Sequence, residues 1–343
     1  MEAFCVVLDT NVWCSELLLN TPNGAALLYI VKRFNAKIGL PEIVEKEISK
    51  VIVKECLKAA KPLKALGPLI GFQLGIESTE EAFAARVTKR LSDLANRFRR
   101  LPFTHEHARG ALERIIQKLP PNGPDREQFR DSAIWEAVLE VARTEAVHFV
   151  TEDKDFFRHR KPKNGPAENI EAEANSQAHQ IRIHDGLPLC LAALQEAGPT
   201  VDKEGLAHSI ESVLRGELTL SAANRGFAVG IMIHCTVKAF FTEQTGVLAI
   251  DFELTFEVDN LAEETREEAR VVCSGSCFFN VSNHSLSEVR KRLEEFSWRN
   301  EHGLPQKSKN YSVFAEAVSL MFGGQKPPAP YSFRAPVEKP DVR

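Results

Sequence analysis

Four acidic residues of this 343-residue chain lie where their carboxylates could bind one metal ion together. Asp9 directly follows a short apolar run, and Asp153 comes two residues after a second apolar run at 147–151. Asp131 opens an amphipathic stretch, and Glu47 lies early in another. Carboxylates that lie close together repel each other, and a hard divalent cation such as Mg²⁺ or Mn²⁺ relieves that repulsion. A cation held in this way can activate water for phosphodiester hydrolysis.

The expected secondary structure would bring these acids to one edge of one sheet. We expect buried strands at 4–8, 37–40, 147–151 and 180–183, because these short apolar runs alternate with helical stretches. Strands that alternate with helices predict an α/β fold with a mostly parallel sheet. Functional sites of such sheets form beyond the carboxyl ends of the strands, which is where the acids lie.

Each acid also has an ordinary structural interpretation. Asp9, Asp131 and Asp153 could each cap a helix or turn, and Glu47 alone resembles any solvated helix glutamate. The combined pattern favours a site, because independent caps need not fall at one sheet edge. A helical wheel places Glu45 and Glu47 on opposite sides of the apolar stripe, so this geometry leaves both glutamates open.

Four segments, in this order and context, resemble the motifs of the PIN-domain nuclease family. They are VVLDTNV at 6–12, PEIVEKEI at 41–48, FRDSAI at 129–134 and FVTEDKDF at 149–156. In the second segment the family's acid precedes an aliphatic residue, which favours Glu47. The resemblance covers about residues 4 to 187. It implies a three-layer α/β/α nuclease that uses Mg²⁺ or Mn²⁺, and many members, bacterial toxin ribonucleases among them, cut RNA.

The resemblance also implies roles for individual side chains. Asn11 and Thr151 would orient ligands or water. A basic segment follows the fourth motif, and we expect Arg158, Arg160 and Lys161 to contact phosphate, the alternative being a solvated loop. The carboxylates implied to hold metal are Asp9, Glu47, Asp131 and Asp153, with Asp155 as a further one.

Composition narrows the class of protein without identifying its partner. The net charge of −4 and the pI near 6.2 give no support for nucleic-acid binding, so any such case depends on local clusters. The start of the chain does not read as a signal peptide, and no apolar run could span a bilayer. Seven scattered cysteines, with Cys273 and Cys277 an isolated pair, and histidines without metal spacing predict neither disulfides nor zinc. We expect a reduced cytoplasmic protein.

We expect three parts: a PIN-like nuclease domain at 1–190, an α+β domain with an antiparallel sheet at 191–322, and a flexible Pro-rich tail at 323–343. The second domain is expected to select the substrate, hold a protein partner or inhibitor, or restrain the nuclease, unless it is only a structural appendage. Within it we expect helices at 202–214 and 285–296, and strands at 228–241, 247–258 and 270–281.

The sequence therefore predicts a metal-dependent endoribonuclease. One alternative is a degenerate nuclease fold that binds RNA or protein, although the presence of all four acids favours activity. Another alternative is a nuclease that acts on DNA, and RNA is the favoured substrate. A homodimer is left open.

Overall fold

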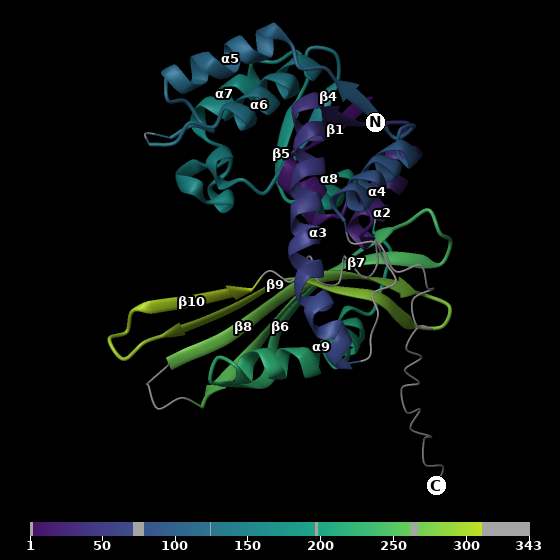
Figure 1. Ribbon diagram of the computed structural model, residues 1–343, viewed down its shortest axis with the longest axis vertical. Coiled ribbons are helices and arrows are strands. Elements are labelled where there is room, and N and C mark those ends of the chain that lie inside the picture. Colours follow the sequence, from purple (N-terminus) through teal and green to yellow (C-terminus); the bar gives the residue numbers. More distant parts are fainter. Residues whose placement is uncertain (1–2, 71–78, 124, 196–197, 262–266, 311–343) are drawn as a thin grey trace. The chain divides into compact units, whose positions relative to one another are not determined.

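The computed structural model describes residues 3–70, 79–123, 125–195, 198–261 and 267–310. The chain divides into two compact units, Met1–Gly198 and Pro199–Arg343 (Figure 1). The domain boundary that the sequence predicts, at residue 190, lies inside helix α8 (Leu187–Leu194). This helix packs on β4 and β5 with Cys190, Leu191 and Leu194 buried, so the first unit extends beyond it. The Pro-rich tail expected at 323–343 lies outside the described residues.

Unit 1 is built on a five-stranded parallel sheet with the strand order β3-β2-β1-β4-β5. Its strands are β1 (Phe4–Leu8), β2 (Lys37–Pro41), β3 (Phe98–Leu101), β4 (Ala146–Thr151) and β5 (Ile181–Asp185). All five residues of β1 are buried, because this strand lies in the middle of the sheet. Its helices are α1 (Thr10–Ser15), α2 (Pro22–Arg33), α3 (Glu42–Ile70), α4 (Glu80–Asp93), α5 (His105–Ile116), α6 (Phe129–Val141), α7 (Glu168–Asn175) and α8, with short 3₁₀ turns η1 (Lys154–Phe156), η2 (Arg158–Arg160) and η3 (Pro162–Asn164).

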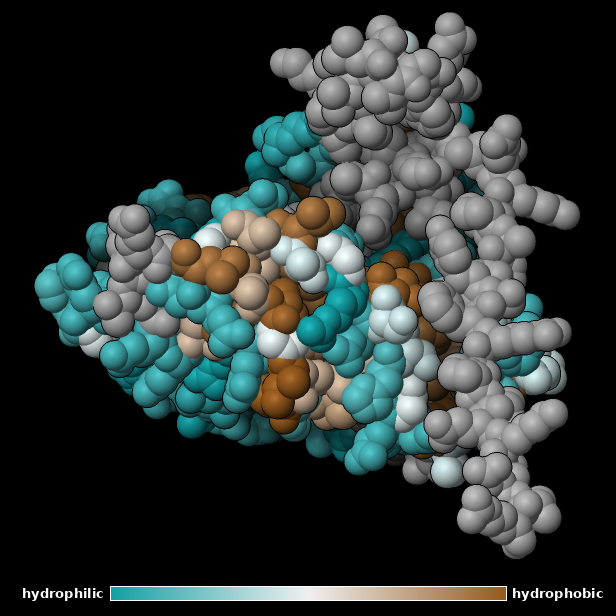
Figure 2. Space-filling model, turned by 90° about the horizontal axis from the view of Figure 1, so that it is seen from below, coloured by the Kyte–Doolittle hydropathy of each residue, from teal (hydrophilic) through white to brown (hydrophobic). Residues whose placement is uncertain are grey.

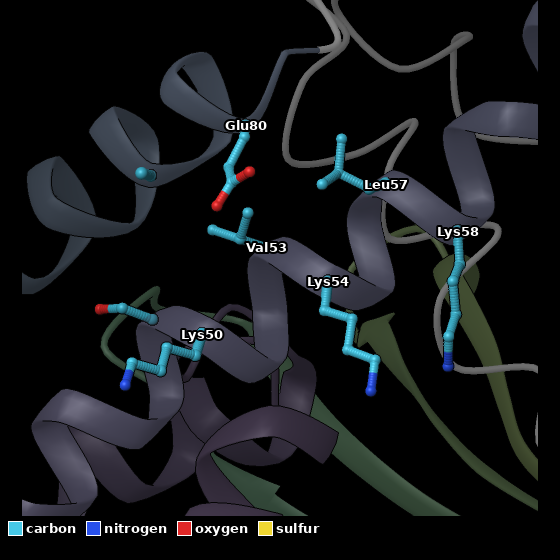
Figure 3. A pocket seen from close by; sticks show the side chains of 8 residues that line it. Lys50, Val53, Lys54, Leu57, Lys58 and Glu80 are labelled. Carbon is cyan, nitrogen blue, oxygen red and sulfur yellow. The ribbon is translucent and has the colours of Figure 1, made fainter.

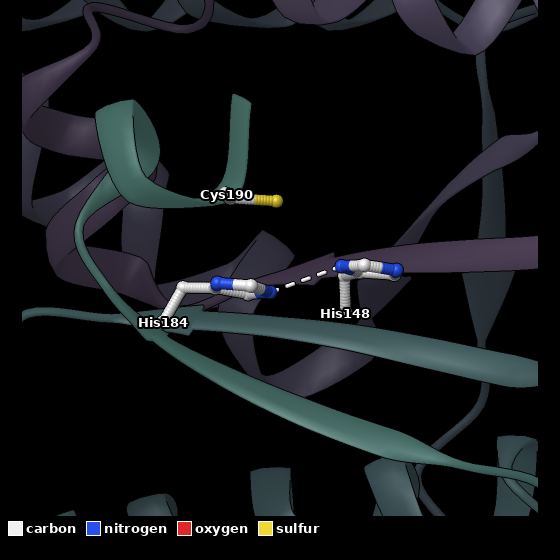
Figure 4. A group of neighbouring side chains, drawn as sticks. All are labelled: His148, His184 and Cys190. Atoms are coloured by element: carbon white, nitrogen blue, oxygen red, sulfur yellow. Dashed lines mark hydrogen bonds between the residues drawn. The ribbon is translucent and has the colours of Figure 1, made fainter. Parts of the chain in front are cut away.

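Helices cover both faces of this sheet. On one face Trp135 of α6 packs on Phe149 of β4, with ring centroids 6.0 Å apart. The neighbouring β4 residue His148 points to the other face, where Cys190 of α8 lies close to it (Figure 4). The expected three-layer α/β/α arrangement with a parallel sheet is therefore confirmed.

Strand β3 is not among the strands that the sequence predicts. Its middle residues Arg99 and Arg100 are exposed and bind Glu145 and Glu45 through ion pairs. The strand pairs with β2 at the edge of the sheet, so tertiary pairing outweighs its weak apolar pattern.

In its described residues, unit 2 has an antiparallel sheet with the long helix α9 packed on it. The sheet has the order β10-β9-β8-β7-β6, in which successive strands are neighbours. Alternate residues of β7 (Leu248, Ile250 and Phe252, for example) share a core with residues spaced four apart on the helix, such as Leu206 and Ile210. The elements are α9 (Lys203–Ala223), β6 (Phe227–Phe241), β7 (Val247–Asn260), β8 (Glu267–Asn280), β9 (Ser285–Arg299) and β10 (Pro305–Asn310).

The helix expected at 285–296 is wrong, because these residues form strand β9. Its charged residues favour a helix locally, but β9 pairs with β8 and with β10 along most of its length. The β8–β9 pairing shifts register beside Gly275, where a Cβ atom would lie 1.9 Å from the Arg290 carbonyl oxygen. Only glycine permits this approach, so the irregular pairing depends on it. The other expected elements of unit 2 are present.

Across the described part of the chain, no helix combines the length and the apolar composition that crossing a bilayer requires.

Candidate metal centre

Asp9 occupies a fixed position at the carboxyl end of β1. It is 3% exposed, and its Oδ1 accepts a 2.6 Å hydrogen bond from the backbone N–H of Thr10, so it also caps α1. Its Oδ2 accepts hydrogen bonds from the Thr151 hydroxyl at 2.6 Å and from Asn11 Nδ2 at 3.0 Å. The ordinary capping role and the site role are therefore compatible, because three donors hold one carboxylate at the sheet edge.

Thr151 and Asn11 connect Asp9 to the end of β4. The Thr151 hydroxyl, which donates to Asp9, accepts from the backbone N–H of Asp153 at 3.0 Å. The Asn11 Oδ1 atom accepts from the backbone N–H of Glu152 at 3.2 Å. Both side chains thus lie where the sequence expects residues that orient the acids, and they tie the ends of β1 and β4 together.

Glu47 and Glu45 have different surroundings, although the helical wheel left both open. The Thr10 hydroxyl donates to Glu47 Oε2 at 2.8 Å, which ties this glutamate to the residue next to Asp9. Arg130 binds the other oxygen of Glu47. Glu45 instead accepts from Arg100 at 2.9–3.1 Å, at the exposed edge of the sheet. Of the two glutamates, Glu47 is the one directed toward the other acids.

Asp131 lies in the first turn of α6, three residues beyond the N-cap residue Gln128, and therefore does not cap this helix. Burial, together with the like charges of Asp9, Asp153, Glu47 and Asp155, raises the pKa of Asp131 to about 8. Burial, together with the charges of Asp153 and Glu47, likewise raises the pKa of Asp9 to about 6. The fold therefore gathers the predicted acids into one electrostatic cluster.

The cluster is open rather than a closed cage of ligands. Within the described ranges, no three of its carboxylates bring oxygens within 4.8 Å of one another. Mg²⁺ usually keeps several of its waters and binds through one or two carboxylates, so this spacing suits a hydrated ion. An all-oxygen donor set of carboxylates fits a hard divalent cation such as Mg²⁺ or Mn²⁺.

Asp155 is placed differently from the other acids. Its Oδ2 accepts from Gln128 Nε2 at 2.6 Å and from Arg126 at 3.3 Å, and Arg160 pairs with its Oδ1 at 3.0 Å. Two cations and an amide occupy this carboxylate, so in this structure Asp155 anchors basic side chains beside the cluster.

The three basic residues expected to contact phosphate have different surroundings. Arg158 binds Glu171 and the Pro166 carbonyl, so it braces the loop. Arg160 pairs with Asp155, and Lys161 is exposed. A hollow of about 840 Å³ beside Asp155 is lined by Arg126 and Arg160. Arg126 is not among the basic residues that the sequence predicts to contact phosphate. Its position, five residues before Asp131, is a signal that could have indicated it.

The lysines of α3 form a second basic feature that the motifs do not show. Lys50, Lys54 and Lys58 are exposed along a groove of about 630 Å³ between α3 and α4 (Figure 3). At 100° per residue they fall within roughly 80° of one another and on the helical face that carries Glu47. Their spacing of four residues could have revealed this face in the sequence. We call these three residues the lysine face.

A comparison with family models matches residues 6–156 to the PIN domain. No curated protein and no solved structure matches the chain. The matched range contains all four motif acids and ends at Phe156, within the turn that follows Asp153. Residues 6–156 of the N-terminal unit therefore form a PIN domain.

Proposed function

We propose that the PIN domain is a divalent-metal-dependent nuclease that hydrolyses phosphodiester bonds in RNA. The observation that carries this proposal is the set of hydrogen bonds from Thr151 and Thr10 that holds Asp9, Glu47 and the Asp153 turn at one sheet edge. Burial and four other carboxylates raise the pKa of Asp131 beside them to about 8. Gathering like charges costs free energy, and a bound divalent cation offsets that cost. Asp9, Glu47, Asp131 and Asp153 are the residues that would hold the cation.

The side chains around the acids contribute positioning. Three hydrogen bonds hold the Asp9 carboxylate in one orientation, and Thr10 holds Glu47 beside it. Bound Mg²⁺ or Mn²⁺ would supply a Lewis acid for the phosphoryl group and lower the pKa of a coordinated water. Because the acids come from the ends of β1 and β4 and the starts of α3 and α6, small displacements of these elements are expected to reduce activity.

Basic groups on two sides of the acids support a polymeric anion as substrate. Arg126 and Arg160 line the hollow beside Asp155, and the lysine face extends from Glu47 along α3. Lys58, the most distant, is eleven residues from Glu47, or roughly 16 Å along the helix axis. A mononucleotide would not span both groups, whereas a nucleic-acid strand would. The preference for RNA follows from the resemblance to the family, and DNA is the other outcome of the test.

The proposal is tested with one labelled single-stranded sequence prepared as RNA and as DNA. We expect internal cleavage of the RNA with Mg²⁺ or Mn²⁺ and none with EDTA. Asp131→Asn, purified in parallel, should lack the activity, whereas the matched exposed change Asp93→Asn on α4 should keep it. Equal cleavage by wild type and Asp131→Asn would overturn the assignment. Metal-dependent binding without cleavage would indicate the degenerate module, and cleavage of DNA alone would change the substrate.

A further inference from the structure

A second cluster of potential metal ligands lies inside unit 1, apart from the acids at the strand ends. His148 of β4, His184 of β5 and Cys190 of α8 bring one donor atom each within 4.8 Å of one another (Figure 4). They lie under α8, whereas the acids lie at the ends of the strands. Separations of 36 and 6 residues match no familiar ligand spacing, so only the fold brings these side chains together.

All three side chains are buried and adopt forms suited to ligation. His148 is 7% exposed, His184 is 9% exposed and Cys190 is fully buried. Burial lowers the pKa of both histidines to about 4, so both imidazoles are neutral near pH 7. Neutral imidazole is the form that binds metal. Burial raises the pKa of the Cys190 thiol, and an ion bound there would displace the thiol proton into solvent.

The two imidazoles already present ring nitrogens to each other. His148 Nδ1 and His184 Nε2 are 3.0 Å apart, with ring planes within 1° of parallel, and the Cys190 sulfur projects toward them (Figure 4). One ring donates an N–H hydrogen bond to the other across this contact. An ion bound between them would leave each ring protonated at its other nitrogen. Tetrahedral bonds of 2.0–2.1 Å need a nitrogen separation of roughly 3.3 Å, a widening of a few tenths of an ångström.

We propose that His148, His184 and Cys190 form a binding site for a zinc-class metal ion. Two imidazoles and a thiolate favour Zn²⁺ over the hard ions Mg²⁺ and Mn²⁺, so this ion differs from the one assigned to the carboxylates. Among the described residues the cluster holds three ligands, and the fourth tetrahedral position is left to water or another small ligand. The ion would join β4, β5 and α8, and so stabilise the strand that leads to Asp153. This proposal does not depend on the nuclease assignment.

Cobalt(II) is the probe, because only a thiolate ligand gives the intense near-ultraviolet sulfur-to-cobalt charge-transfer band. The full chain, reduced and stripped with EDTA, is titrated with Co²⁺ in excess Mg²⁺, which occupies the carboxylates. We expect one equivalent to produce the band and Zn²⁺ to abolish it. Cys190→Ser should lose the band. Two matched controls should keep it: Cys277→Ser, which is equally buried, and Cys235→Ser, which is half-buried.

A second variant and a second readout cover the case in which Cys190→Ser fails to fold. His184→Gln should weaken Co²⁺ binding at least roughly 10-fold. Zn²⁺ at 100 times its Kd should raise the melting temperature of the wild type by about 5–10 °C and leave that of His184→Gln nearly unchanged. Absence of the band in the wild type, its persistence in Cys190→Ser, or its loss in Cys235→Ser would overturn the site. The histidine pair would then be an ordinary hydrogen bond of the core.

Discussion

Two clusters of buried charge, one in each unit, are built in opposite ways. In unit 2, Lys291 is 3% exposed and pairs with both Glu217 and Glu294, so positive and negative charge lie together. In the PIN domain, Asp9 and Asp131 lie among further acids, and burial raises the pKa of both. A paired charge serves packing, whereas gathered like charges cost stability unless a cation joins them. Under the proposed function, the gathered acids of the PIN domain are the charge that serves chemistry.

The largest expected effect is the loss of cleavage in Asp9→Asn. The substitution keeps the shape of Asp9 and leaves one oxygen to accept the hydrogen bonds from Thr151 and Asn11, but it removes the charge, so metal binding should fail. We expect turnover to fall by roughly 1,000-fold or more while the melting temperature stays within a few degrees of the wild type. Steady-state cleavage and thermal unfolding are measured on the same preparations. Undiminished turnover would remove the distinction between the two units.

The next effect separates the two glutamates that the sequence alone leaves open. Glu47→Gln should raise the Mn²⁺ concentration needed for half-maximal cleavage by roughly 10- to 100-fold. Glu45→Gln is the matched control, because Glu45 pairs with Arg100 rather than with residues of the cluster. A Mn²⁺ titration of cleavage that ranks the variants in the reverse order would move the role to Glu45.

The lysine face is expected to have a smaller effect on binding. Lys54→Glu should weaken RNA binding by about 5- to 10-fold and lower the slope of log affinity against log salt by about 1–2. Lys46→Glu is the control, since Lys46 lies on another side of α3 and already pairs with Glu42. Fluorescence anisotropy at several salt concentrations gives both values. Equal losses in the two variants would reduce the lysine face to an ordinary solvated surface.

The pKa shifts predict how pH changes the stability of the metal-free protein. The pKa of Asp131 is about 8 in the folded protein, against an ordinary value of 3.8. The folded state therefore binds more protons, and this stability is fully present below about pH 4 and lost as pH rises through about 8. In EDTA, the wild type should lose a few degrees of melting temperature relative to Asp131→Asn between pH 5 and pH 8.5. If the melting temperatures of the two proteins change with pH in parallel, the acids are not gathered as described.

The smallest effect is expected from removing unit 2. A chain that ends at Gly198 should fold, keep metal-dependent cleavage, and change by only a few fold in rate or specificity, because the motif acids all lie in unit 1. A change of this size would agree with a unit 2 that selects the substrate or restrains the nuclease. Insolubility would show that the units share one core. Identical rates on every substrate would make unit 2 an appendage.

Local sequence predicts the PIN domain well because each motif acid lies within a few residues of the strand or helix that positions it. Asp9 directly follows the buried run of β1, and Asp153 follows β4 within two residues, so element order alone brings them to one edge. Strand β3 is not predicted because its two central arginines are exposed and interrupt the apolar pattern that would indicate a strand. The sequence also cannot rank Glu45 and Glu47 by periodicity. The hydrogen bond from Thr10, 37 residues away, distinguishes them.

Unit 2 is harder to predict because its signals are not local. Residues 285–296 have the composition of a helix, yet cross-strand pairing with β8 makes them part of β9. Their charged residues are accommodated by partners elsewhere, such as Glu217 of α9 for Lys291. The cluster of His148, His184 and Cys190 is likewise not indicated by local sequence, since only folding brings its members together. Contacts between residues that are distant in sequence therefore decide the features that local sequence patterns do not predict.

Direct measurement of Mn²⁺ binding tests whether the four acids of the PIN domain form one metal site. Electron paramagnetic resonance counts free Mn²⁺ as the wild type and Asp131→Asn are titrated, with Asp93→Asn as the matched control. We expect the wild type and Asp93→Asn to bind Mn²⁺ alike, and Asp131→Asn to bind it at least roughly 10-fold more weakly. Equal binding by all three proteins would contradict the single metal site.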